Sequence, residues 1–144
     1  SYPHLFPIFR YAEILLNYAE AQNEVTGPDN TVYSAINAIR NRVGMPSLPS
    51  GLTQAEMREK IRHERRVEFA FEEHRFWDIR RWKIAETVLN GTLHGIQGIN
   101  NSGVTTYKVV DATPVMFNAS KMYLFPIPLN EMISNKSMVQ NPNW

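Results

Sequence analysis

The stretch at residues 61–82, IRHERRVEFAFEEHRFWDIRRW, constrains the fold most, because it is dense in both charges and aromatic rings. It contains no glycine or proline, so nothing in it interrupts a helix. Glutamates recur at every fourth position, which on a helix places them in one acidic stripe with arginines close by. We therefore predict a helical spine with partly buried ion pairs. The spine residues are Glu64, Arg65, Glu68, Glu72, Arg75, Asp78 and Arg81.

The apolar positions of this spine predict which of its sides is buried. Val67, Ala70 and Phe71 lie off the acidic stripe at spacings that suit burial. Trp77 and Trp82 offer ring faces of the kind that bind sugars, but on such a helix tryptophan more often belongs to the core. We expect all five side chains to be packed inside.

The histidines of this stretch do not have the spacing that known metal-binding motifs require. A zinc-protease helix needs a second histidine four residues after His63, and that position is Val67. A di-iron bundle needs glutamate three residues before histidine, but Lys60 and Phe71 precede His63 and His74. We expect neither a metal nor another cofactor.

An enzyme is also not expected. Glu64 and Glu68 have a spacing that a glycosidase pair could use, but arginines crowd both carboxyls and keep them ionised. The chain has neither a nucleophile elbow nor a phosphate-binding loop.

Composition excludes several further classes. The net charge is +1, and residues 56–86 hold nine Lys/Arg against eight Asp/Glu, so phosphate binding and nucleic acid are not favoured. No apolar run is long enough for a transmembrane helix, and without cysteine there is no disulfide or thiolate site. The opening SYPH is no natural start, which predicts that the chain is the C-terminal piece of a longer protein.

Residues 1–46 predict a helical hairpin of the tetratricopeptide type. The first helix runs over residues 10–26 with a stripe that includes Tyr11 and Val25, and Gly27-Pro28 stops it. Asp29 or Asn30 then caps a second helix that ends on an inward-facing Val43.

Residues 52–90 predict the spine helix. Its start carries a capping box at residues 53–56, TQAE, with Leu52 and Met57 placed as a hydrophobic staple. A helix that reaches Asn90 is long for a globular protein, so we expect a break near residues 73–75.

Residues 91–144 predict a long loop at 91–106, short strands at 107–110 and 121–125, and an extended, docked tail. Together the pattern predicts one domain over residues 1–144. Its fold class is mainly α, with tetratricopeptide-like helical hairpins, a long bent helix and a few short β segments.

Four segments in order resemble the SusD/RagB family of outer-membrane nutrient-binding lipoproteins. They are residues 10–21 (RYAEILLNYAEA), 39–46 (IRNRVGMP), 64–82, and 123–128 (YLFPIP) followed by Glu131 and residues 140–142. The chain departs from the family pattern at Glu73 and Asn143, where glycine is usual, and at Lys136, where proline is usual.

The resemblance implies a non-catalytic protein on the cell-surface face of the outer membrane, which binds oligo- or polysaccharides or other nutrients. It implies a SusC-type TonB-dependent transporter as partner, a helical scaffold with pocket-forming loops, and a lipid anchor upstream of Ser1. The matched motifs are expected to be scaffold.

Glycan binding needs aromatic faces against sugar rings and polar groups for the hydroxyls. Candidates lie in and beside the expected loop, where a merely flexible surface is the alternative. They are His94, Gln97, Asn100, Asn101 and Tyr107.

The competing function is a tetratricopeptide-type interaction scaffold without sugar binding. An open groove lined by Asn17, Asn37 and Asn41 would favour it, while a surface filled by arginine–carboxylate pairs would count against it.

Overall fold

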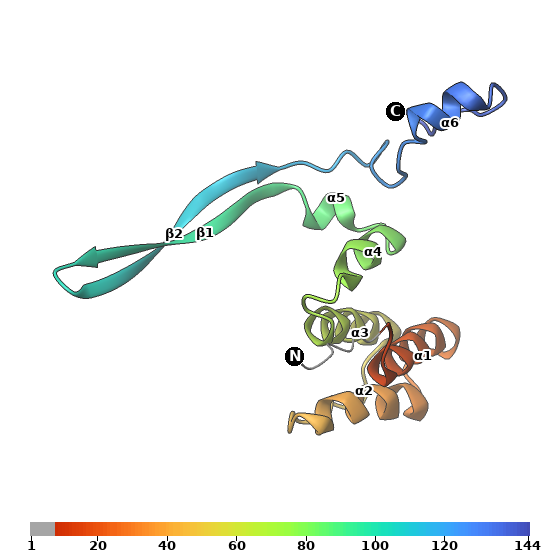
Figure 1. Ribbon diagram of the computed structural model, residues 1–144. Helices are drawn as coiled ribbons and strands as arrows, with labels where there is room; N and C mark the ends of the chain where they lie inside the picture. Colours follow the sequence, from red (N-terminus) through yellow and green to blue (C-terminus); the bar gives the residue numbers. More distant parts are fainter. Residues whose placement is uncertain (1–7) are drawn as a thin grey trace, which may run out of the picture. The chain divides into compact units, whose positions relative to one another are not determined.

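The computed structural model describes residues 8–144. The chain forms two compact units, Ser1–Arg75 and Phe76–Trp144, and each is described by itself. Figure 1 shows the helices of the first unit in red to green and the second unit in green to blue. The mainly helical fold class that the sequence predicts is confirmed.

Three helices make up the first unit: α1 (Tyr11–Thr26), α2 (Asn30–Arg42) and α3 (Gln54–Glu68). As predicted, α1 ends at the glycine stop, where Gly27 adopts φ 81°. Asp29 caps α2, because its carboxylate accepts hydrogen bonds from the backbone N–H groups of Thr31 and Val32. The short connection therefore follows from local chemistry.

The predicted capping box of α3 is also confirmed. The Glu56 backbone N–H donates to Thr53 Oγ1 over 3.2 Å, and the Thr53 N–H donates to Glu56 Oε2 over 2.8 Å. Met57 is fully buried and Leu52 packs against its cluster, so the staple forms too.

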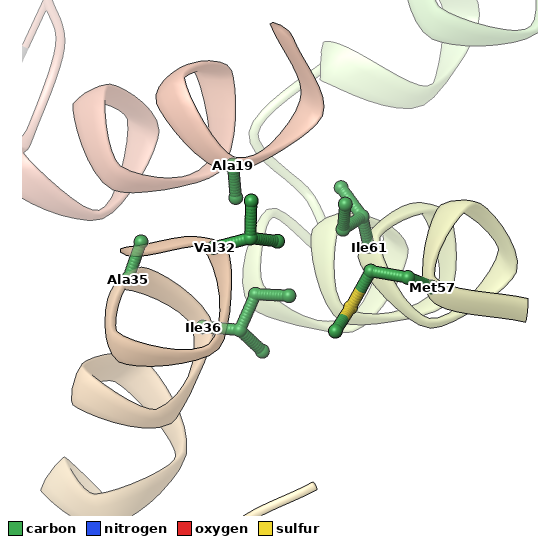
Figure 2. Close-up of a cluster of buried hydrophobic side chains, with 6 residues drawn as sticks. All are labelled: Ala19, Val32, Ala35, Ile36, Met57 and Ile61. Carbon is green, nitrogen blue, oxygen red and sulfur yellow. The ribbon is translucent and has the colours of Figure 1, made fainter. Parts of the chain in front are cut away.

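Apolar side chains from all three helices form the core of this unit (Figure 2). The cluster consists of Ala19, Val32, Ala35, Ile36, Met57 and Ile61. A neighbouring cluster joins Leu16, Ile39 and Phe69, so α1 contributes to both. Burial of this apolar surface is the main force that holds the helices together.

Several positions that the periodicity predicts to be inward are exposed. Tyr11 and Val25 face solvent because the buried side of α1 runs instead through Leu16, Ala19 and Asn23. Val43 is exposed because α2 ends one residue before it.

The predicted long helix is shorter and broken earlier than expected. α3 ends at Glu68, residues 69–73 form a turn, and α4 (His74–Arg81) and α5 (Ala85–Val88) follow. Phe71 and Glu73 both adopt φ 65°, a left-handed conformation that no helix can contain. Positive φ at Lys83 likewise separates α4 from α5.

The expected loop at residues 91–106 is mostly sheet. β1 (Gly91–Asn101) pairs antiparallel with β2 (Val104–Val115), with an irregularity between Leu93 and His94. Ser102 and Gly103 have φ 54° and 90°, and two left-handed residues are what a tight two-residue hairpin turn requires. Glycines within β1 hide the alternating pattern from sequence reasoning.

Residues 121–125, expected as a strand, are turns instead. The Met122 N–H donates to Asn118 O over 2.8 Å, which bends the chain back on itself. Beside them Phe117 packs with Ile79 and Ala85 as the core of the second unit. A short helix, α6 (Leu129–Ser134), precedes the tail.

The tail is held by its own amide and indole groups. Gln140 bonds both backbone groups of Ile127, at 2.7 and 3.0 Å, and Asn141 donates to Phe125 O over 2.6 Å. The Trp144 indole N–H lies 3.0 Å from the carbonyl oxygens of both Lys121 and Leu124. These contacts satisfy backbone carbonyls that no helix or strand pairs.

Candidate functional site

Arg10 organises the end of α3. Its guanidinium donates to both Glu72 carboxylate oxygens, at 2.8 and 2.9 Å, and to the Glu68 backbone O at 2.6 Å. It also bonds the Glu68 carboxylate and lies 4.8 Å from the centre of the Phe69 ring. Sequence reasoning did not assign Arg10 to the spine, since it precedes Glu68 by 58 residues.

The other spine carboxylates are paired from α2. Glu64 accepts from Arg40 at 2.7 Å, and Glu68 accepts from Arg42 at 2.9 and 3.0 Å. Both glutamate side chains are about nine-tenths buried. The expected stripe of Glu64, Glu68 and Glu72 thus meets arginines that come from before the spine in the sequence.

The remaining spine residues lie in separate places. Arg65 is buried on α3 and donates to Asn17 Oδ1 over 2.7 Å. Asp78 is buried on α4, where Arg81 Nε donates to it over 2.9 Å. Arg75 occupies the second position of α4. The structure therefore divides the seven spine residues between the two units.

The charges at the end of α3 shift the pKa values of the groups that carry them. The hydrogen bond from Arg10 holds the pKa of the Glu72 carboxyl below its ordinary value. In return, the hydrogen bond to Glu72 raises the pKa of the Arg10 guanidinium. Both groups are thus firmly ionised at neutral pH, as a structural pair should be.

A cleft of about 430 Å³ opens beside this pair in the first unit. It is lined by Ile8, Phe9, Arg10, Glu13, Phe71, Glu72, Glu73 and His74. Of its polar groups, Arg10 and Glu72 bond each other, and His74 Nε2 lies 4.0 Å from Glu13 Oε2. Among residues 8–144 there is no group of three His, Asp or Glu side chains placed to hold a metal ion.

The five predicted ligand residues all lie on the β1–β2 hairpin but do not share one face. Because side chains alternate along a strand and paired residues point the same way, His94, Asn100 and Tyr107 lie on one face. Gln97 and Asn101 lie on the other. The sequence could not show this split, since it depends on the register.

The face with Tyr107 has an open aromatic ring. Tyr107 pairs with Gly98 and is well exposed, and a side chain at Gly98 would meet its ring edge at 3.7 Å. His94 Nδ1 lies 2.9 Å from Asp111 Oδ1 further along this face. An exposed ring beside polar side chains is the arrangement that a sugar-binding surface needs.

The second unit carries another exposed aromatic group that sequence reasoning placed in the core. Trp77 is 59% exposed and lies 6.2 Å from the Phe125 ring, which is also exposed. Phe76 is covered on one side by the Arg80 guanidinium, 3.6 Å from its ring centre. Trp77 is exposed on α4 because Asp78 and Ile79 lie on the buried side of the helix.

Val67, Ala70 and Phe71, also expected inside, are exposed as well. The acidic stripe, with its arginine partners, takes the side of α3 that packs on α1 and α2, so Val67 is left outside. Phe71 lies on the turn that follows the helix.

Two of the three groove amides of the competing scaffold function, Asn17 and Asn37, accept hydrogen bonds within the fold. Asn17 accepts from Arg65, and Asn37 Oδ1 accepts from the Leu48 N–H over 2.9 Å. Since these amides stabilise the fold, a peptide groove built on them is not favoured. In the described part of the chain no helix combines the length and hydropathy of a membrane span.

These features describe a mainly helical protein in which arginine–glutamate pairs hold the end of α3 against α2 and Arg10. The model of the SusD family matches residues 4–144, and the chain belongs to that family. It is 32% identical over 139 residues to SusD-like protein P2 of Formosa agariphila. This alignment covers 92% of this chain and 24% of that protein. SusD-like protein P25 of the same organism is 31% identical, with 93% and 23% covered.

Solved structures agree with the family match. A SusD homolog from Bacteroides thetaiotaomicron is 34% identical with a TM-score of 0.71, covering 95% of this chain and 26% of that one. A SusD-like carbohydrate binding protein from Bacteroides vulgatus shares the fold at 21% identity and a TM-score of 0.60, with 91% and 29% covered. The chain thus spans about a quarter of the length of the relatives it matches.

Proposed function

We propose that this chain is the C-terminal part of a glycan- or nutrient-binding lipoprotein on the outer face of the outer membrane. It binds its ligand without cleaving it and delivers it to a SusC-type TonB-dependent transporter. The observation that carries this proposal is the match to the SusD family along residues 4–144. The lipid anchor would belong to the part of the protein before Ser1.

The buried pairs support a non-catalytic role. A glycosidase needs one carboxyl that stays protonated as the acid and a second one across an open cleft. Glu64 and Glu68 are instead held by Arg40 and Arg42, and the pKa of Glu72 is lowered. The lowered pKa makes the Glu72 carboxyl a poor proton donor at neutral pH, and the ion pairs of Glu64 and Glu68 occupy their carboxylate oxygens.

Within this chain, we assign ligand contact to the hairpin residues. Tyr107 would stack on a sugar ring, while His94 and Asn100 on the same face would bond its hydroxyls. Gln97 and Asn101 would contact a ligand only if it wrapped over the turn to the other face. The exposed ring of Tyr107 is the group on which this assignment depends.

Affinity electrophoresis of paired variants tests the assignment. In a gel containing a polysaccharide that retards the unmodified protein, Tyr107→Ala should migrate as in a ligand-free gel. The control is Thr106→Ala, on the opposite face of the same strand. Equal retardation of Tyr107→Ala and the unmodified protein would show that the hairpin does not bind the ligand.

A further inference from the structure

Phe71 is presented to solvent by a strained turn. Its side chain is 106% exposed, and it adopts φ 65°, as does Glu73 two residues later. A left-handed residue other than glycine is strained and persists only where its surroundings enforce the conformation. Such strain commonly marks a position that serves a binding role.

The surroundings of Phe71 do enforce this conformation. Before it, Phe69 is buried, and its ring lies 4.4 Å from the His74 ring, centre to centre. After it, Glu72 accepts two hydrogen bonds from Arg10, which also holds the end of α3 through Glu68. The turn is therefore fixed on both sides of Phe71, so the exposure of this ring is not the property of a loose loop.

Other apolar side chains lie beside Phe71 in the cleft, whose remaining lining residues are charged or polar. Phe71 lines the 430 Å³ cleft together with Ile8 and Phe9, both of which are largely exposed. An exposed apolar surface around a fixed aromatic side chain is typical of a protein interface, where such residues act as anchors.

We propose that Phe71 is an internal docking anchor. It inserts into an apolar socket on the part of the polypeptide that the family's longer proteins carry outside the stretch matched here. The length of those proteins argues for this occupant, because the chain covers only 24% of one relative and 26% of a solved homolog. Roughly three quarters of the fold is then available to cover a ring that the first unit leaves bare.

This inference does not depend on glycan binding, since it concerns only how the parts of the protein assemble. If the socket belongs to the same polypeptide, the Phe71 ring is shielded from solvent at every protein concentration and without any transporter. A second copy of the protein as occupant makes it concentration-dependent.

Hydroxyl-radical footprinting of the purified full-length protein, without transporter, tests the proposal. The oxidation rate of Phe71 relative to the denatured protein should fall by about tenfold or more, equally at low and high protein concentration. The control is Val25, which is exposed near the end of α1. Unprotected Phe71, or protection that appears only at high concentration, would overturn it.

A pair of variants gives an independent readout. Phe71→Ala should lower the Tm of the full-length protein by roughly 3 °C or more, as expected for loss of a buried aromatic ring. Val25→Ala should leave the Tm nearly unchanged. A Tm for Phe71→Ala that matches the unmodified protein would contradict the proposal, because a solvent-exposed ring contributes little.

Discussion

At the residue scale, the end of α3 is held by pairs of arginine and glutamate that are far apart in the sequence. Glu68 is the shared partner, since it accepts from Arg10 and Arg42. The sequence predicts the acidic stripe from its spacing alone. It does not predict Arg10, because a contact over 58 residues leaves no periodic signal.

Glu68→Ala should lower the free energy of unfolding by about 2–4 kcal/mol, because it leaves Arg10 and Arg42 without their shared carboxylate. Urea denaturation measures this change. The control is Glu59→Ala, whose surface pair with Arg62 should contribute less than about 1 kcal/mol. Equal effects of the two variants would show that the Glu68 pairs behave as solvated ones.

The pH dependence of stability should include Glu72. Its pKa is lowered in the folded state, chiefly by the hydrogen bond from Arg10, from an ordinary value of 4.5. The unfolded chain therefore binds more protons as pH falls, so the contribution is complete above pH 4.5 and is lost as pH falls through the lowered pKa.

Thermal melts of Glu72→Gln between pH 7 and the acid range measure that contribution. The variant should lose less stability on acidification than the unmodified protein does, because it has no carboxyl to protonate at this position. Parallel curves would mean that the pair with Arg10 does not stabilise the fold.

At the element scale, the parts with strong local signals were predictable and the hairpin was not. The Gly27 stop, the Asp29 cap and the Thr53 capping box each use neighbouring residues, so the sequence alone specifies them. The β1–β2 pair depends on register, and Gly95 and Gly98 interrupt its alternation. The glycines therefore suggested a loop.

Removing the N-terminal cap of α3 should lower the stability of the protein. Thr53→Ala should destabilise the protein by about 1 kcal/mol, because the N–H of Glu56 loses its acceptor. Chemical denaturation measures the loss, with Ser50→Ala in the preceding connector as the control. An effect no larger than that of Ser50→Ala would argue against the capping box.

The hairpin turn provides a second test at this scale. Gly103→Ala should speed amide exchange along β1 and β2, because alanine resists the φ of 90° that Gly103 adopts. Gly95→Ala is the matched control, since its added Cβ would make an ordinary 3.7 Å contact with Ala112. Hydrogen–deuterium exchange reads both, and identical exchange in both variants would disprove the turn geometry.

At the scale of the whole molecule, four ordered segments were enough to predict the family, which the match over residues 4–144 confirms. The ligand face is a different matter. Residue types suggested five candidates, but only the pairing of β1 with β2 shows that His94, Asn100 and Tyr107 share one face. The Tyr107 ring is exposed on that face. Families are specified by local motifs, whereas sites are specified by how distant segments meet.

Glycan binding is the central claim, and affinity electrophoresis with a panel of soluble polysaccharides tests it most directly. The full-length protein should be retarded by at least one glycan class, with a non-binding protein unaffected in the same gel. The 144-residue chain run alongside shows whether the hairpin suffices. Migration of the full-length protein unchanged by every polysaccharide would contradict the proposed function.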